Sequence, residues 1–219
     1  MIRILLILTF LGSFMSMHAQ STNLRFNVEV DPQFAWFRSD DESAEPDGSI
    51  FHLHAGLNMD YFFAENYAFV LGVGINNLGG NLLYADSTGF SSKGEDLLIE
   101  PNQSVKLNLQ YIDIPLGLKL KTEELGYTTV FLQLGFNPMI NLNAKASSVD
   151  ADFQKEDVKE SINAFCLGYH AGLGVEYSLG GSTSLIGGLR WSSGLTDVTD
   201  NDRANVSLNS ITIHLGVLF

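Results

Sequence analysis

Bulky apolar residues alternate with small or polar ones along residues 164–179, where the pattern is clearest. The odd positions from Phe165 to Leu179 are all apolar or aromatic, whereas the even positions from Cys166 to Ser178 are small or polar. A period of two is typical of an extended strand with two different faces. Glycine dominates the small face, and it weakens a strand unless something must come close to it. A crowded lumen supplies that reason, so the pattern predicts bulky side chains facing lipid and small or polar ones facing inward.

Seven further segments alternate in the same way, and together they predict an all-β fold, an eight-stranded antiparallel up-and-down transmembrane β-barrel. Long connections follow the first, third, fifth and seventh segments, and short ones follow the others, which is the layout of outer-membrane barrels. Closing the ring leaves no sheet edge in hydrocarbon. The predicted strands are about 24–36, 51–61, 67–76, 105–120, 130–137, 165–179, 185–195 and 211–219.

Two positions interrupt the pattern. Pro32 cannot donate to a ladder, so it predicts a bulge or a locally unpaired position. Near Tyr111 the apolar residues change from odd to even positions. A slip of one residue turns every side chain to the other face, so we expect a bulge near Tyr111. Alternatively, the upper part of this segment lies outside the bilayer, where the alternation is not enforced.

Aromatic residues gather at both ends of the predicted strands, as the interfacial girdles of membrane barrels do. The set at the short-turn end is Tyr61, Tyr67, Tyr127, Tyr177 and Phe219, and the set toward the long loops is Phe34, Trp36, Phe51, Phe165 and Trp191.

The first residues predict export. Arg3 precedes a short apolar run over residues 4–11, and Met17-His18-Ala19 follows it. This is the pattern of a cleaved secretory signal peptide over residues 1–19, followed by the barrel domain over residues 20–219. An uncleaved anchor helix is the alternative, but the run is shorter than the roughly 20 residues that a spanning helix needs. Removing residues 1–19 changes the net charge from −13 to −14, which argues against a nucleic-acid partner. The single cysteine, Cys166, cannot form an internal disulfide and is interpreted as a buried space-filler.

The segment Tyr111-Ile112-Asp113-Ile114-Pro115-Leu116-Gly117-Leu118-Lys119 resembles a motif of the PorT-like outer-membrane β-barrel family of Bacteroidota. The segments 172–177 and 214–219 add to the resemblance, which covers the whole mature chain in layout. It implies an integral outer-membrane barrel. Some members of that family are linked to protein secretion and gliding, but the resemblance does not assign that role to this chain. The C-terminal Phe219 resembles the signal read by the outer-membrane assembly machinery, and it also suits the girdle.

Charged and polar side chains on the inward face are the candidate chemistry. An eight-stranded barrel is just wide enough for its side chains to fill it, so opposite charges there are expected to pair. We expect a structural network of salt bridges centred on Asp113, Lys119, Glu176 and Arg190, with no metal or cofactor. The inward set is Arg25, Glu29, Asp31, His52, His54, Asp60, Asp113, Lys119, His170, Glu176, Arg190 and His214.

The interpretation is a non-enzymatic outer-membrane barrel with a structural, adhesive or envelope-partner role. Its expected partners are outer-membrane lipid, the assembly machinery and an envelope protein that the sequence does not identify. A second hypothesis is a lipid A-modifying hydrolase or acyltransferase that uses a rim histidine, His52 or His54, with a serine and a carboxylate. A metal site from the same histidines lacks a convincing ligand set. A third hypothesis is a soluble periplasmic barrel with inverted faces that binds a small apolar ligand.

Overall fold

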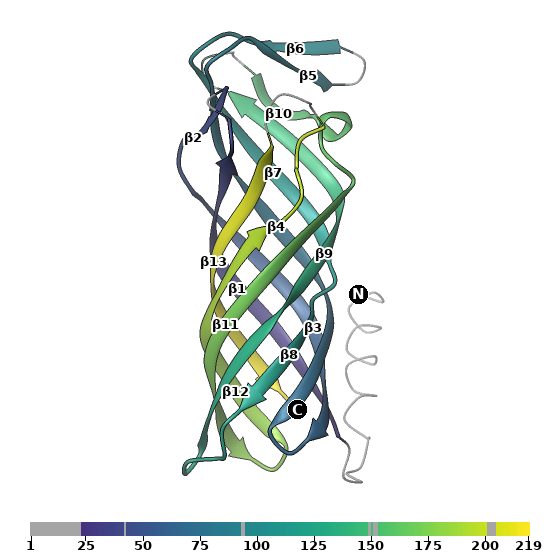
Figure 1. The fold of residues 1–219 in the computed structure, drawn as a ribbon, viewed down its shortest axis with the longest axis vertical. Helices are drawn as coiled ribbons and strands as arrows, with labels where there is room; N and C mark the ends of the chain where they lie inside the picture. Colours follow the sequence, from purple (N-terminus) through teal and green to yellow (C-terminus); the bar gives the residue numbers. More distant parts are fainter. Residues whose placement is uncertain (1–22, 42, 93–94, 149, 151–152, 201–204) are drawn as a thin grey trace, which may run out of the picture.

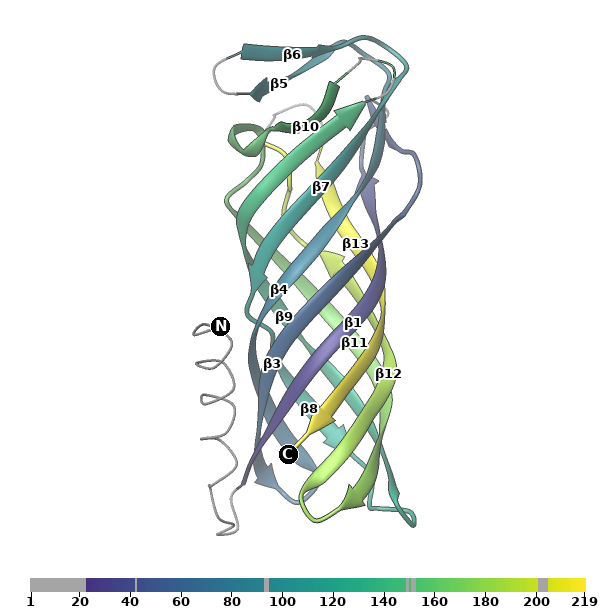
Figure 2. The ribbon, with the colours of Figure 1, turned by 180° about the vertical axis from the view of Figure 1, so that it is seen from behind.

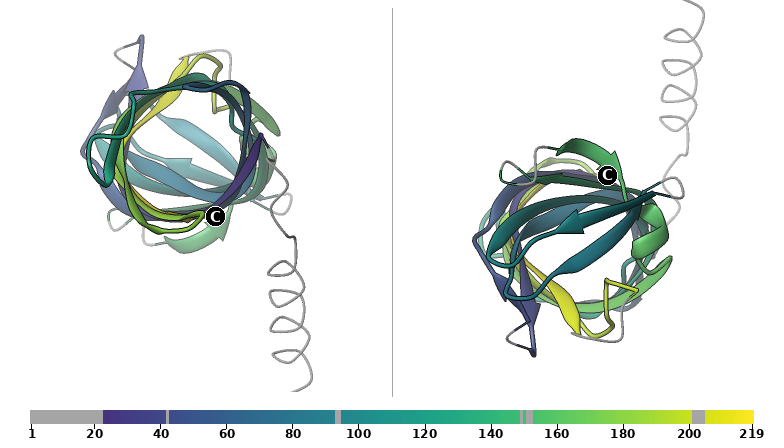
Figure 3. Two further views of the ribbon diagram at one scale, coloured as in Figure 1. Left: turned by 90° about the horizontal axis from the view of Figure 1, so that it is seen from below. Right: turned by 90° about the horizontal axis from the view of Figure 1, so that it is seen from above.

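The computed structural model describes residues 23–41, 43–92, 95–148, 150, 153–200 and 205–219. In these residues the chain forms a tall closed barrel of tilted antiparallel strands (Figure 1; Figure 2). Seen along its axis the barrel is a ring (Figure 3). The ring strands are β1 (Leu24–Ser39), β3 (Ile50–Ala64), β4 (Tyr67–Tyr84), β7 (Gln103–Asp113), β8 (Leu116–Lys121), β9 (Thr128–Ser148), β11 (Phe165–Gly180), β12 (Thr183–Gly194) and β13 (Val206–Leu218).

The first and last strands pair with each other and close the ring. Gln33 on β1 lies opposite Thr212 on β13. β7 and β8 share one place in the ring, because both pair with β4 on one side and with β9 on the other. The eight-stranded antiparallel barrel is therefore confirmed. The predicted signal peptide, residues 1–19, lies outside the described residues.

Among the described residues, no helix is long and apolar enough to cross a bilayer.

An apolar belt surrounds the outside of the lower barrel. Leu173 is 60% exposed, and Leu132 and Ile213 are 41% and 44% exposed, so these side chains point outward rather than into a common interior. On β1 the outward apolar positions run from Leu24 to Phe34, which matches the about 9–11 residues that a tilted strand needs to span a bilayer. This belt is the lipid-facing surface.

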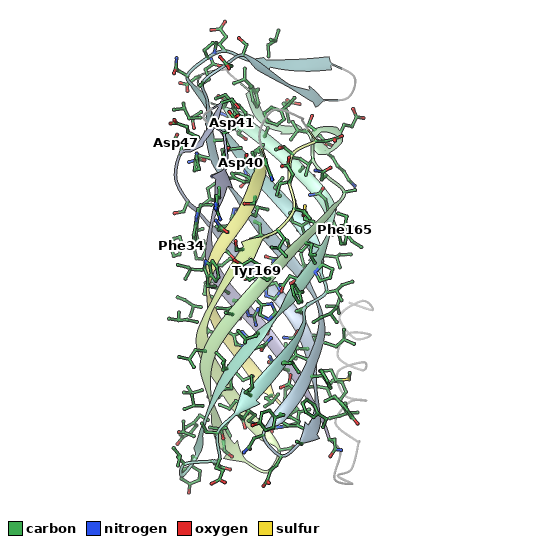
Figure 4. The ribbon with its side chains drawn as sticks, viewed as in Figure 1. Phe34, Asp40, Asp41, Asp47, Phe165 and Tyr169 are labelled. Carbon is green, nitrogen blue, oxygen red and sulfur yellow. The ribbon has the colours of Figure 1, made fainter. Side chains whose placement is uncertain are left out.

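The two predicted aromatic girdles lie at the edges of this belt. At the short-turn end the rings of Tyr127 and Tyr177 lie 6.3 Å apart, and at the other edge those of Phe34 and Phe51 lie 5.6 Å apart. Figure 4 shows Phe34 partway up the barrel, well below the acidic residues Asp40, Asp41 and Asp47 near the upper end.

Above the belt the two faces of the wall are reversed: apolar side chains face inward and polar side chains face outward. β4 and β9 contain 18 and 21 residues, more than a bilayer requires, and their upper parts continue beyond it. On β7, Leu107 and Tyr111 are fully buried inside the barrel, whereas Lys106 and Gln110 lie on the outer face. The upper barrel therefore has an apolar core and a polar exterior, as a water-soluble domain does.

The predicted bulge is not on the strand that carries Tyr111. Odd positions face inward along both β7 and β8, so no side chain changes face there. The extra residue lies on the partner strand, because Gln110 is opposite Asn143 while Tyr111 is opposite Asn141. The apolar residues change from odd to even positions because the core above gives way to lipid below, which was the alternative explanation.

Prolines mark two further irregularities. Ile114 and Pro115 separate β7 from β8, although the Ile114 N–H still donates to the carbonyl of Pro138. At Pro32 the ladder between β1 and β13 is interrupted without a change of register, and the Asp31 carboxylate accepts the Leu215 N–H at 2.8 Å. The prediction of a locally unpaired position is confirmed there, and the alternative of a bulge is wrong.

Short elements cover the upper end of the barrel. The long connection predicted after the third segment is in part strand, because β4 continues to Tyr84 and the rest contains a separate hairpin that lies across the top (Figure 1). Phe90 and Ile99 from this hairpin are buried in the upper core. The covering elements are β2 (Ala44–Pro46), β5 (Thr88–Ser92), β6 (Glu95–Ile99), β10 (Phe153–Asp157) and the 3₁₀ turn η1 (Lys159–Ser161).

Candidate functional site

The polar residues of the lower barrel point into the lumen because strand alternation turns every second side chain inward. Asp31 and His54, and all members of the predicted network except Arg25, are buried, and Arg25 is partly exposed at the short-turn end. The structure divides these residues into two charged clusters and one amide-bonded histidine. The predicted network residues are Arg25, Glu29, Asp60, Asp113, Lys119, His170, Glu176, Arg190 and His214.

The lower cluster lies nearest the short turns and is centred on Lys119. Its Nζ is 2.8 Å from Asp60 Oδ2 and 2.8 Å from Glu176 Oε1, and it sits 4.7 Å from the centroid of the Phe131 ring. Glu176 also pairs with Lys121, and Arg25 Nη1 lies 3.5 Å from it. Three cations and two carboxylates are thus gathered at one level, and buried charges of opposite sign satisfy each other there.

Lys121 is the residue of this cluster that the sequence analysis missed. It occupies an odd position on β8, two residues after Lys119, so the same alternation points it inward. The predicted strand ends at residue 120, one residue before Lys121, so the prediction leaves Lys121 out of the lumen set. Its ammonium group lies 5.3 Å from the centroid of the Phe62 ring.

The middle cluster surrounds Glu29 and Asp31 on β1. Arg190 Nη1 lies 3.5 Å from Glu29 Oε1 and 3.6 Å from Asp31 Oδ2. His214 Nδ1 is 3.1 Å from Asp31 Oδ2, and His54 bridges two strands, with Nδ1 3.4 Å from Asp31 and Nε2 3.4 Å from Asp113. Arg190 and Asp113 thus belong to this cluster, while Lys119 and Glu176 belong to the lower one. The four residues expected to form one centre therefore occupy two.

Two of the predicted inward histidines have other surroundings. His170 bonds with amides, since its ring nitrogens face Asn137 Oδ1 and, at 3.3 Å, Gln133 Nε2. His52 is half-buried and lies opposite the inward-facing Gln33 in the β1–β3 ladder, so strand alternation turns it inward as predicted. It also borders a groove lined by Asn77 and Lys145.

A cavity of about 30 Å³ lies in the lumen beside His54, Asp113 and Arg190, with room for one or two water molecules. Inward glycines are needed at this density: a Cβ on Gly74 would lie 2.6 Å from both Asp113 Oδ1 and His54 Nε2. The side chains around this cavity are therefore closely packed.

Glu29, Asp31 and His54 could in principle hold a metal ion, since one ligand atom from each lies within 4.8 Å of the others. The guanidinium of Arg190 already faces both carboxylates, and Asn58 donates to Glu29 Oε2 at 2.6 Å. These donors satisfy the oxygens that a metal would need. The arrangement therefore fits an ion-paired network better than a metal centre.

The same contacts bear on whether a lumen histidine could act as a catalytic base. His54 and His214 face carboxylates, and His170 faces amides, so each ring is held by a structural partner. An acyl hydrolase needs a serine hydroxyl within reach of its histidine base. Among the described residues, none of these three rings has a hydrogen bond to a serine.

The upper core contains buried polar atoms as well. The hydroxyl of Tyr84 is buried there without a hydrogen-bond partner in the described residues. Burial raises the pKa of Tyr84 well above its usual range, so the phenol is neutral. Cys166 is buried as predicted, with its Sγ 3.9 Å from the hydroxyl of Tyr111.

Three solved structures of outer-membrane and surface proteins are similar to this chain. Neisserial surface protein A is 16% identical, with a TM-score of 0.47, over 88% of this chain and 95% of that one. Ail, the attachment invasion locus protein of Yersinia pestis, is 13% identical, with a TM-score of 0.42, over 89% and 98%. OprG from Pseudomonas aeruginosa is 10% identical, with a TM-score of 0.46, over 90% and 95%. Similarity at this level carries no argument about function.

A comparison with curated proteins gave no match. The model of the family described as outer membrane protein beta-barrel domain matches residues 13–200, well over half of the chain. The closed ring, the lipid-facing belt and this match lead to one conclusion: the chain belongs to the outer membrane protein β-barrel domain family.

Proposed function

We propose that this protein is a non-catalytic outer-membrane barrel that anchors a folded β extension outside the cell, where the extension binds an envelope or surface partner. The observation that carries the proposal is the exchange of faces along the wall. The lower barrel is plugged by ion pairs and faces lipid with apolar side chains, and the upper barrel has its own core, which includes Leu82, Leu107 and Tyr111.

An extension beyond the lipid offers a surface to which a partner can bind. The strands that rise above the belt place the polar outer face and the covering hairpin beyond the lipid surface. The acidic residues Asp40, Asp41 and Asp47 lie near this upper end (Figure 4). Surfaces supported by a rigid scaffold are where binding residues are usually found.

Export and assembly belong to the same proposal. The signal peptide over residues 1–19 would deliver the chain across the inner membrane. Phe219 would serve as the assembly signal: it is 50% exposed at the short-turn end, and its backbone N–H donates to the carbonyl of Phe26 at 2.8 Å. The motif at residues 111–119 supports a place among PorT-like barrels, without a secretion role being carried over.

Cysteine labelling of intact cells tests the orientation on which the proposal depends. The native Cys166 is buried, so introduced cysteines report on their own positions. Glu45→Cys, in the exposed β2 segment, should react with a membrane-impermeant maleimide in intact cells, whereas Glu65→Cys, in a short turn, should react only after permeabilisation. The reverse pattern would refute an outward extension.

Two further measurements test the absence of transport and of catalysis. Planar bilayers containing the folded protein should show no stable conductance, because the lumen is filled. Mass spectrometry of lipid A should give the same species with and without the protein; a change would favour the lipid-modifying hypothesis instead. Crosslinking through a photoreactive group at Glu45 in native envelopes would then capture the partner.

A further inference from the structure

His54 on β3 lies in the middle of the lumen with carboxylates on both sides of its ring. Its Nδ1 is 3.4 Å from Asp31 Oδ2 and 3.5 Å from Glu29 Oε1. On the other side of the ring, Nε2 is 3.4 Å from Asp113 Oδ1. An ionised carboxylate can only accept hydrogen bonds, and a neutral imidazole has one donor nitrogen and one acceptor nitrogen. A neutral His54 would therefore point the lone pair of one nitrogen at a carboxylate oxygen.

The wall of the barrel is shaped around this ring. A Cβ on Gly74 of β4 would lie 2.6 Å from His54 Nε2, and a Cβ on Gly56 of β3 would lie 3.1 Å from His54 Cε1. Larger residues at these two positions would therefore collide with the imidazole. Its place between the carboxylates depends on the two glycines that lie beside it.

The charges around His54 do not balance unless its ring is charged. Three buried carboxylates, Glu29, Asp31 and Asp113, face this level of the lumen. Among the described residues, Arg190 on β12 is the permanent cation within salt-bridge distance of any of them, at 3.5 Å from Glu29 and 3.6 Å from Asp31. Asp113 has only His54 within that distance in the same part of the chain. Because an unpaired buried charge is costly, Asp113 needs the imidazole as its cation.

His170 on β11 has contacts of the opposite kind. Gln133 Nε2 donates to its Nε2 at 3.3 Å, and its Nδ1 bonds to Asn137 Oδ1. One ring nitrogen thus accepts and the other donates, as in a neutral imidazole. His170 is as deeply buried as His54, so burial alone does not distinguish the two rings.

His214 on β13 is the remaining titratable group that faces the middle cluster. Its Nδ1 lies 3.1 Å from Asp31 Oδ2 but also 3.2 Å from Arg190 Nη2, which is a donor. The contacts of this nitrogen therefore do not require a proton on it. His54 is the ring that has carboxylates at both nitrogens.

We propose that His54 is protonated on both ring nitrogens in the folded barrel, and that this imidazolium makes the stability of the barrel sensitive to alkaline pH. A free histidine loses its second proton near about pH 6.5. Above that pH the folded state binds one proton more than the unfolded state. The stabilisation is therefore complete below about pH 6.5 and declines as the pH rises, until the folded barrel also releases the proton. A doubly protonated ring has no lone pair for a metal ion, which agrees with the ion-paired character of this cluster.

Nitrogen-15 NMR of the folded barrel at about pH 8, where an ordinary histidine is neutral, tests the protonation directly. We expect the native chain to show a histidine with both ring nitrogens protonated. His54→Gln should lack this signal, and the matched control His170→Gln should keep it. A native barrel without such a histidine would overturn the proposal, even if His54→Gln does not fold. Retention of the signal by folded His54→Gln would also overturn it.

Urea titration in lipid vesicles at several pH values tests the link between this proton and folding. Above about pH 7 we expect the unfolding equilibrium constant of the native chain to rise about tenfold per pH unit relative to that of His54→Gln, which is the effect of one proton. His170→Gln should follow the native chain. The same pH dependence in the native chain and in His54→Gln would show that folding does not depend on this proton, and the proposal would be wrong.

Discussion

The ammonium nitrogen of Lys119 lies 2.8 Å from a carboxylate oxygen of Glu176, with both side chains at most 3% exposed. The same nitrogen is 2.8 Å from Asp60, so one cation joins strands that are far apart in the sequence. Such a bridge fixes the relative height of β3, β8 and β11 around the ring. Its removal leaves charge inside a narrow barrel that has no bulk water to solvate it.

Lys119→Met is therefore expected to lower the free energy of unfolding by about 3–5 kcal/mol, because Asp60 loses its ion-pair partner while buried. Urea titration of the protein folded into lipid vesicles measures this change. The double variant Lys119→Met/Asp60→Asn should recover part of the loss, since the unpaired charge is also removed. A double variant less stable than the single one would contradict the explanation.

Gly74→Val is expected to destabilise the barrel by about 1–3 kcal/mol through overpacking. Any Cβ at this position would lie 2.6 Å from Asp113 Oδ1 and His54 Nε2. Gly187 is the matched control, because a Cβ there meets no atom within 4 Å, so Gly187→Val should have little effect in the same urea titration. Equal losses for both variants would show that strand propensity rather than lumen crowding is responsible.

Leu173→Arg is expected to cost about 2–4 kcal/mol, the penalty for a cation at the middle of the bilayer on the lipid face of a barrel. Leu173 is 60% exposed and lies near the centre of the apolar positions of β11. Glu45→Arg, on the exposed β2 segment, should be nearly neutral. The measurement is the unfolding free energy in vesicles, and a neutral Leu173→Arg would place this face in water.

Leu107→Ala is expected to cost about 2–5 kcal/mol by leaving a cavity in the upper core, where Leu107 is fully buried. Limited proteolysis of vesicle-embedded protein should show faster cleavage in the upper barrel, with the lower barrel protected. Leu98→Ala is the control, since that side chain is 73% exposed. Unchanged proteolysis of Leu107→Ala would argue against an independent upper core.

The sequence predicts the lower barrel well because one physical rule applies to it. Lipid outside and a crowded lumen inside favour apolar residues at outward positions and small or polar ones at most inward positions, as at Leu173 and Gly174. The eight strands, both aromatic girdles and the inward direction of Lys119 and Glu176 follow from that alternation.

Other features depend on information that alternation does not contain. The apolar run that includes Leu107 has the same period whether it faces lipid or a core. The sequence alone therefore could not distinguish a reversal of the two faces above the bilayer from a bulge near Tyr111. The division of charges into two clusters depends on the stagger of the strands, which pairs Arg190 with Glu29 rather than with Glu176.

The exchange of faces also bears on how the molecule is built. Its upper exterior carries Lys106, Asn108 and Lys145, and carrying these groups through hydrocarbon as part of a finished surface would cost several kcal/mol for each charge. Crossing as separate unpaired strands would be no cheaper, because the same charges and unpaired backbone groups would then meet hydrocarbon. We therefore expect the upper strands to need a route that shields them from lipid while the barrel is assembled.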